Sequence, residues 1–187
     1  MAVLAEVISV VIRTDALLRA FGDWDSFTET VPNNTLCTDG ELARVGFMTP
    51  GDVKAYVESL AARGLVYLDN GTARDLVVVD QQRGPAAPCE WVEFGQVNLD
   101  GDPAKRVSAC RLRGSTAKQI VTPDGWHFEK SLSASFGFVP NGQEEKAMTF
   151  VRREGNLEVY RSRLTGDLVY VARTETAVSP DREGGQR

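Results

Sequence analysis

The clearest structural signal in this chain is the stretch Thr49–Gly64, which reads TPGDVKAYVESLAARG. Thr49 is a suitable N-cap, Pro50 fits the first helical position, and Asp52 stands three residues after the cap. Apolar side chains then recur at helical spacing on one face, at Val53, Tyr56, Val57, Leu60 and Ala61. Gly64 can adopt the left-handed conformation that ends many helices. The stretch therefore predicts a helix over residues 50–63.

Strand-like runs lie on both sides of this helix. They are residues 7–12, 42–48, 65–68 and 76–79. Thr14 predicts the cap of a short helix after the first run, and Asp23 predicts the cap of a further helical turn. The Asn70-Gly71 dipeptide predicts the turn between the last two strands. The order β-α-β-α-β-β predicts an α+β fold with a ferredoxin-like pattern in its front part.

A connector that contains proline and glycine, residues 81–88, leads to a second part that is rich in strands. Turn dipeptides such as Asp100-Gly101 separate these strands, which is typical of an antiparallel β meander. The predicted strands are 90–98, 106–113, 119–122, 126–131, 147–153, 157–163 and 167–173. We therefore predict one compact domain over residues 1–176, with possible lobes 1–80 and 89–176, followed by a flexible tail over 177–187.

The composition argues against several classes of protein. A net charge of −5 and a pI of about 5.0 give no general attraction to nucleic acid. The three cysteines are widely spaced and there is one histidine, so we expect neither a disulfide framework nor a metal site. The chain lacks a secretion signal and a run of about 18 apolar residues, which predicts a cytoplasmic protein without membrane contact. No nucleotide-binding motif occurs, and we expect no cofactor.

Four short runs resemble a family of uncharacterised bacterial proteins. The runs are 32–37 (PNNTLC), 45–48 (VGFM), 79–81 (VDQ) and 89–91 (CEW). The resemblance covers about a third of the chain, between residues 32 and 94. It implies no activity, so the function has to be argued from the residues themselves.

The first candidate site follows the apolar strand that ends at Asp80. After the connector the chain returns through Cys89, Glu90, Trp91 and Glu93. Carboxylates at a strand end beside a tryptophan can form a pocket with shifted pKa values. The alternative is a turn acid, a tryptophan that packs in the core and an exposed glutamate, because strand ends are commonly polar.

A second candidate is a nucleophilic site that would pair Cys89 or Cys110 with His127, the only histidine. Neither thiol stands in a recognisable nucleophile motif. Free cysteines commonly pack as small buried hydrophobic residues, and His127 lies between Trp126 and Phe128 in a predicted strand. The pattern therefore favours a structural role for all three residues.

A basic stretch forms the third candidate. Arg111 and Arg113 alternate along one predicted strand, and Arg161 and Arg163 alternate along another. If these strands are neighbours, four guanidinium groups line one surface that could bind phosphate or carboxylate. The alternative is a solvated sheet face on which the arginines pair with acids such as Glu158.

Two functional hypotheses follow from these patterns. The first is a non-catalytic binding or protein-interaction domain that contacts a partner, or a second copy, through a sheet face or edge. We rank it first because the chain shows no coherent catalytic set. The second is a small-molecule enzyme or ligand-pocket protein with its site near residues 80–93.

Overall fold

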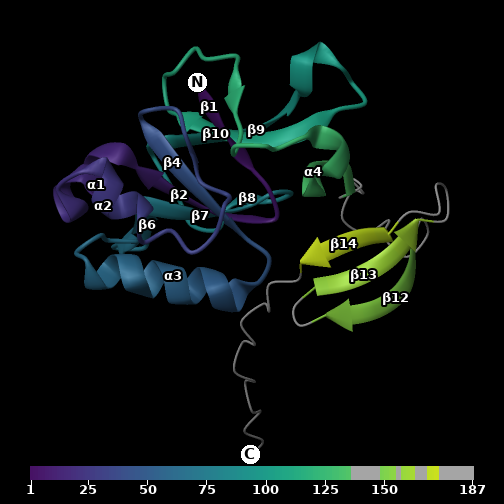
Figure 1. Ribbon diagram of the computed structural model, residues 1–187, viewed down its shortest axis with the longest axis horizontal. Helices are drawn as coiled ribbons and strands as arrows, with labels where there is room; N and C mark the ends of the chain where they lie inside the picture. Colours follow the sequence, from purple (N-terminus) through teal and green to yellow (C-terminus); the bar gives the residue numbers. More distant parts are fainter. Residues whose placement is uncertain (136–147, 155–156, 163–167, 173–187) are drawn as a thin grey trace, which may run out of the picture.

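The computed structural model of the chain describes residues 1–135, 148–154, 157–162 and 168–172, and Figure 1 shows how they are arranged. Its centre is a five-stranded antiparallel sheet with the order β3-β4-β2-β7-β8. The strands are β2 (Ile8–Arg13), β3 (Cys37–Thr38), β4 (Leu42–Phe47), β7 (Leu76–Asp80) and β8 (Gly84–Pro85). The central strand β2 is almost entirely buried, which explains its apolar, β-branched composition.

Helix α3 (Pro50–Ala62) packs against β2 and β4 and confirms the helix predicted over residues 50–63. The cap is the predicted one, because the Thr49 hydroxyl oxygen accepts a hydrogen bond from the Asp52 backbone N–H at 3.2 Å. Gly64 has a φ of +94°, the left-handed conformation expected after the helix. All the signals that predicted α3 are therefore local ones.

Two shorter helices precede α3, namely α1 (Thr14–Phe21) and α2 (Trp24–Thr28). Asp23 caps α2 as predicted, because its carboxylate accepts a hydrogen bond from the Ser26 backbone N–H at 2.7 Å. The cap predicted for α1 is wrong, since Arg13 and not Thr14 occupies the N-cap position. β2 extends to Arg13 and the helix follows it directly, which draws Thr14 into the first turn.

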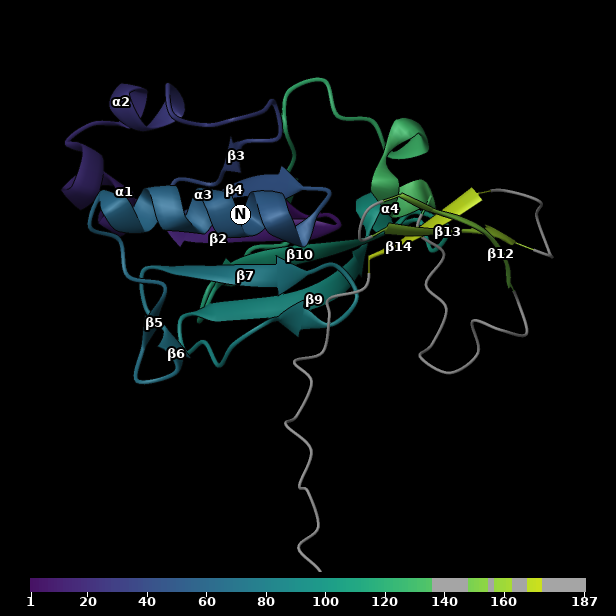
Figure 2. The same ribbon diagram turned by 90° about the horizontal axis from the view of Figure 1, so that it is seen from below.

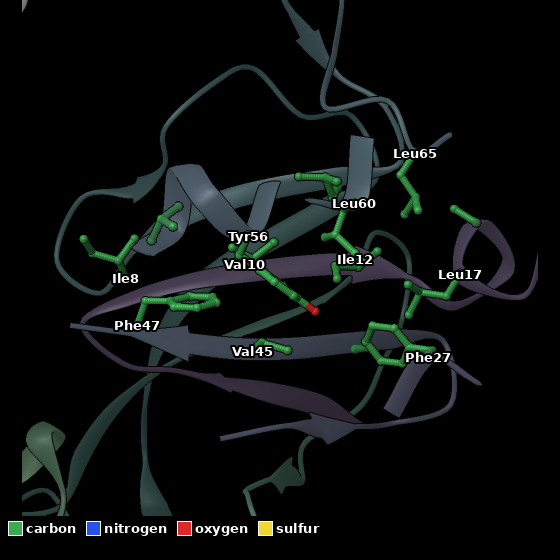
Figure 3. Close-up of a cluster of buried hydrophobic side chains, with 14 of the residues drawn as sticks. Ile8, Val10, Ile12, Leu17, Phe27, Val45, Phe47, Tyr56, Leu60 and Leu65 are labelled. Carbon is green, nitrogen blue, oxygen red and sulfur yellow. The ribbon is translucent and has the colours of Figure 1, made fainter. Parts of the chain in front are cut away.

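An apolar layer lies on each face of the central sheet. Val10 and Ile12 of β2 pack with Tyr56 and Leu60 of α3, and Figure 3 shows this cluster. Val11, which alternates with them, belongs to a second cluster on the opposite face. The central sheet is therefore covered by helices on one side and by a second sheet on the other.

The second sheet has the order β11-β1-β10-β9, in which β1 pairs antiparallel with β10 and parallel with β11. Its strands are β1 (Ala2–Ala5), β9 (Val92–Asn98), β10 (Arg106–Leu112) and β11 (Ile120–Val121). Figure 2 shows β9 on the side of β7 that faces away from α3. The predicted strands 90–98, 106–113 and 119–122 are thus confirmed, but the N-terminal strand β1 is inserted among them.

A sharp bend at Glu6 and Val7 separates β1 from β2. Val7 has a φ of +49°, an uncommon conformation for a β-branched residue. The bend sends β1 into one sheet and β2 into the other. The sequence predicted only the second of these strands, because the partners of β1 lie about a hundred residues further along the chain.

The remaining elements are short or lie apart from these two sheets. The turn at Asn70-Gly71 lies where it was predicted, but it joins the short strands β5 (Leu68–Asp69) and β6 (Thr72–Ala73). The predicted pairing of strands 65–68 and 76–79 is wrong, because β7 pairs with β2 and β8 instead. The strand predicted over 126–131 is wrong, because the 3-10 helix η2 (Phe128–Lys130) occupies it. The other short helices are η1 (Leu99–Gly101) and α4 (Leu132–Ser135). A further three-stranded sheet is an antiparallel meander of β12 (Met148–Glu154), β13 (Leu157–Ser162) and β14 (Leu168–Ala172).

The architecture confirms an α+β fold dominated by antiparallel pairing. The ferredoxin-like order is not confirmed, since β2 pairs antiparallel with both β4 and β7. Both predicted lobes contribute to one apolar cluster, for example through Val11 and Val92. The predicted tail over 177–187 lies outside the described residues. No helix in the described part of the chain is both long enough and apolar enough to cross a membrane.

Candidate functional site

Asp80, the centre of the first predicted site, shapes a turn. Its carboxylate accepts hydrogen bonds from the backbone N–H groups of Gln82 at 2.8 Å and Arg83 at 2.9 Å. A carboxylate that satisfies two backbone donors in this way is a common feature of tight turns. The geometry matches the turn-acid alternative for Asp80.

At the return of the chain, Cys89 and Trp91 pack on the protein core whereas Glu90 does not. The Trp91 indole N–H donates to the Ala73 backbone oxygen at 3.1 Å, and the ring packs on the second apolar cluster. Cys89 packs against the same cluster, and burial raises the pKa of its thiol. Glu90 is exposed. Neither of the two cavities described below is lined by Asp80, Glu90 or Trp91.

Glu93 and Arg111 form an ion pair across β9 and β10, with 2.8 Å between carboxylate oxygen and Nε. The hydrogen bond from Arg111 lowers the pKa of the Glu93 carboxyl group. The pair lines a small cavity of about 230 Å³ with Phe94 and Lys118. The alternative interpretation of the basic stretch was that its arginines pair with acids on a sheet face. Arg111 and Glu93 form such a pair.

Arg113 also acts on this pair, since its positive charge contributes to the lowered pKa of the Glu93 carboxyl group. Arg113 is exposed and its Nε donates to the Glu90 backbone oxygen. Arg161 belongs to β13 and only its backbone is described, and Arg163 lies outside the described residues. The four-arginine patch therefore stays a prediction.

The predicted pair of a cysteine and a histidine is not brought together by any described hydrogen bond. His127 is exposed and precedes η2. Cys110 is completely buried in the second apolar cluster, where burial raises the pKa of its thiol to about 12. A protonated, inaccessible thiol is a poor nucleophile.

A cleft of about 800 Å³, larger than the cavity beside Glu93, was not predicted from the sequence. Five segments form it: the bend between β1 and β2, the chain between α2 and β3, the C-terminal half of β4, one side of α3, and the segment that leads into α4 with its first residue. Its lining consists of Glu6, Val7, Thr30, Pro32, Asn33, Asn34, Thr35, Arg44, Gly46, Phe47, Met48, Asp52, Ala55, Tyr56, Ser59, Pro123, Asp124, Gly125, Trp126 and Leu132.

Arg44 lies at the floor of this cleft and is only 2% exposed. Its Nε donates to the Ser9 hydroxyl at 2.8 Å, and its two terminal nitrogens donate to the backbone oxygens of Glu6 at 3.0 Å and Thr35 at 3.3 Å. Burial lowers the pKa of the guanidinium group, although arginine keeps its charge in proteins. Among the described residues no carboxylate lies within 4 Å of this buried charge.

Gly46 makes room for the guanidinium group of Arg44. A Cβ atom at position 46 would lie 2.4 Å from the nearest terminal nitrogen of Arg44 and 2.7 Å from Cζ. The Gly46 backbone is itself held by the wall of the cleft, because its N–H donates to the Thr35 hydroxyl at 2.6 Å and its carbonyl accepts from the Asn33 amide at 2.9 Å. The side chain of Arg44, the backbone of Gly46 and the 33–35 segment therefore form one hydrogen-bonded unit.

Glu6 is the second charged residue at the floor, and it is 8% exposed. One carboxylate oxygen accepts hydrogen bonds from the Ser133 backbone N–H at 2.9 Å and from the Ser133 hydroxyl at 2.6 Å. The other oxygen accepts from the Trp126 indole N–H at 3.2 Å. Glu6 thereby fixes both α4 and the segment before it against the bend, across more than a hundred residues of sequence.

Hydrogen bonds with Gln81 hold the bend that presents Glu6. The Val7 backbone N–H donates to the Gln81 side-chain oxygen at 2.8 Å, and the Gln81 N–H donates back to the Val7 carbonyl at 2.9 Å. The Ser108 hydroxyl donates to the Gln81 carbonyl at 2.6 Å, which ties the second sheet to the same point. These bonds keep Val7 in its strained backbone conformation.

Aromatic side chains form much of the apolar wall of the cleft. The rings of Phe47 and Tyr56 lie 5.1 Å apart, and Figure 3 shows them side by side. The Tyr56 hydroxyl is buried without a hydrogen-bond partner among the described residues, and burial raises its pKa. Trp126 adds a third aromatic side chain to the lining. The cleft therefore combines aromatic surface with two fixed charges of opposite sign.

The signals that could have indicated this site were the charges inside apolar strands. Glu6 and Arg44 each interrupt a β-branched or apolar run, and a buried charge requires a specific environment. Two of the four runs that carry the family resemblance, 32–37 and 45–48, also form part of the cleft wall. Within the described residues there is no group of three or more potential metal ligands.

Comparison with known proteins leaves the site to be interpreted on its own geometry. No family model, no curated protein and no solved structure matches the chain.

Proposed function

We propose that the chain is a non-catalytic binding protein whose cleft holds a small organic ligand. The observation that carries the proposal is the cleft of about 800 Å³ with aromatic walls and charged groups at its floor. Ligand sites in proteins have volumes of about 300–1,000 Å³, apolar walls and a few fixed polar groups. The cleft matches each of these properties.

The fixed geometry of the charged groups supports binding rather than catalysis. Each nitrogen of the Arg44 side chain donates to a protein oxygen, and Glu6 accepts three hydrogen bonds from Ser133 and Trp126. Such groups are well suited to orienting a ligand. A general acid or base, by contrast, must exchange its proton with the substrate during the reaction.

The alternative function, a small-molecule enzyme or ligand-pocket protein with its site near residues 80–93, has less support. The carboxylate of Asp80 is occupied by two backbone N–H groups, and that of Glu93 by Arg111. A protein partner at a sheet face or edge stays compatible with ligand binding in the cleft, because the cleft does not occupy the edge strand β9.

Binding of a neutral fluorescent probe tests the proposal. N-phenyl-1-naphthylamine has an apolar body that suits the aromatic wall, and we expect saturable binding to the intact chain. Ala55 is exposed on α3 and lines the cleft, so Ala55→Trp fills it and lowers the affinity about tenfold or more. Ala61, which is exposed on the same helix and does not line the cleft, provides the control Ala61→Trp.

The proposal fails if the intact chain does not bind the probe. It also fails if the two tryptophan variants bind the probe equally well, because binding would then occur elsewhere. Circular dichroism of both variants verifies that α3 is retained.

A further inference from the structure

We infer that the ligand of the cleft is an organic cation, an amine with an apolar body. This inference rests on the proposed function and adds the chemical class of the ligand. It is carried by the predominantly acidic charged residues that line the cleft and by the contact between Glu6 and Trp126 at its floor.

The charged residues that line the cleft are predominantly acidic. Among its described lining residues three are acids, Glu6, Asp52 and Asp124, and Arg44 is the single base. Arg44 is almost completely buried, and all three of its nitrogens donate to protein oxygens. The two outer acids, in contrast, are exposed. A ligand that enters the cleft therefore meets negative charge before it could reach the guanidinium group.

Glu6 retains hydrogen-bonding capacity toward a ligand. A carboxylate oxygen can accept about two hydrogen bonds. The oxygen that faces Ser133 accepts two, but the other oxygen accepts one, from the Trp126 indole N–H. An ammonium group can supply the missing donor and the opposite charge, and both favour an amine over an alcohol or a carboxylic acid.

Trp126 supplies a second attraction for a cation. Its ring is held beside the Glu6 carboxylate by the 3.2 Å hydrogen bond, and it remains partly exposed. A cation near an indole face is attracted by the electron density of the ring. The same ammonium group can thus interact with the carboxylate and the aromatic ring, while Phe47, Met48 and Tyr56 contact the apolar body.

The two exposed acids stand at positions where they attract a cation during its approach. Asp52 lies in the first turn of α3, where its carboxylate accepts a hydrogen bond from the Thr49 hydroxyl at 2.8 Å. Asp124 lies in a turn that is closed by a hydrogen bond from the Trp126 backbone N–H to the Pro123 carbonyl at 3.1 Å. Such charges act over about a Debye length and lose their influence in salt.

An organic anion at Arg44 is the competing ligand class. It would have to approach Glu6 and the two exposed acids, and it would have to displace the Thr35 or Glu6 carbonyl from the guanidinium group. Like charges at short range and the loss of hydrogen bonds to a buried charge both oppose this arrangement.

Three probes with the same apolar body separate the classes: octylammonium, octanol and octanoate. Calorimetric titration of the intact chain at low salt is expected to show octylammonium binding about tenfold more tightly than octanol, and octanoate more weakly than octanol. The preference for octylammonium is expected to decrease severalfold in 0.5 M salt, at a Debye length of roughly 4 Å.

Variants that remove one negative charge test which acid causes the preference for octylammonium. Glu6→Gln is expected to bring the affinity for octylammonium to within about two- to fivefold of that for octanol, and Asp124→Asn to reduce it about two- to fivefold. Asp124 is exposed, so its variant keeps the inference testable even if Glu6→Gln loosens the segment before α4. The matched control is Asp100→Asn, an exposed position away from the cleft with φ of +52°, a conformation that asparagine tolerates.

The outcomes distinguish this inference from the proposed function. If octylammonium and octanol bind equally, or if octanoate binds most tightly, the inference is wrong while the cleft remains a ligand site. If none of the three probes binds and the neutral dye does not bind either, the proposed function is wrong as well.

Discussion

An alanine at position 46 would test whether Arg44 is held rigidly at the floor of the cleft. Its Cβ would lie 2.4 Å from a terminal nitrogen of Arg44 and 2.7 Å from Cζ, distances at which one of the two groups must move. The guanidinium group can move only by giving up hydrogen bonds to Ser9, Glu6 or Thr35. A hydrogen bond to a charged group contributes roughly 1.5–3 kcal/mol. Loss of one or two of them predicts a destabilisation of about 3 kcal/mol for Gly46→Ala.

Equilibrium unfolding in urea, followed by tryptophan fluorescence, measures this difference. At roughly 2–4 °C per kcal/mol for a chain of this size, the midpoint of thermal unfolding should fall by about 6–12 °C. Gly95 in β9 provides the control, because an added Cβ there meets no atom within 4 Å. Gly95→Ala is expected to change the free energy of unfolding by no more than about 1 kcal/mol, mostly in the stabilising direction.

A double variant isolates the clash with Arg44. Met is unbranched and lacks the planar head group, so Gly46→Ala should cost much less in an Arg44→Met background than in the original chain. The reasoning is refuted if Gly46→Ala and Gly95→Ala differ by less than about 1 kcal/mol, since Arg44 would then rearrange freely.

Two further predictions concern the bend and the buried thiols. Gln81→Leu should destabilise the chain by about 1–3 kcal/mol, because the buried Val7 N–H loses its acceptor. Gln82→Ala should have little effect in the same urea titration. Equal effects of the two substitutions would contradict the role of Gln81. Burial raises the pKa of Cys37 to about 11 and that of Cys110 to about 12, so stability is at its full value below the ordinary thiol pKa of 9.0 and falls as pH rises from 9 through these values. Unfolding at a series of pH values checks the slope, which should flatten in Cys110→Ala; an unchanged slope would show that other groups cause it.

The accuracy of the sequence-based predictions depended on how local the deciding interactions are. Helix α3 was predictable because its cap, its apolar face and its glycine stop all lie within Thr49–Gly64. The strand predicted at 126–131 failed because alternation of Trp126 and Phe128 resembles a strand, whereas their rings in fact pack edge-to-face 6.4 Å apart beside η2. Alternation over so few residues cannot separate these cases.

The cleft was not predictable because no one segment contains it. Glu6, Asn33, Arg44 and Trp126 come from separate regions of the chain, and only the pairing of the strands brings them together. The predicted site at residues 80–93 had a clear local pattern of acids around an aromatic residue. In the structure that pattern corresponds to a turn, a core contact and a surface ion pair.

The bend at Val7 also has a consequence for the synthesis of the chain on the ribosome. Ala5 pairs with Ser108 and Ala2 with Ile120, so β1 emerges about a hundred residues before its partners do. At about 5–20 residues per second this leaves an apolar strand unpaired for roughly 5–20 seconds. The central sheet can form during that interval from β2, β4 and β7, but Glu6 cannot meet Trp126 until the nascent chain has grown past it. The cleft is therefore completed only after the strands of the central sheet it rests on have been synthesised.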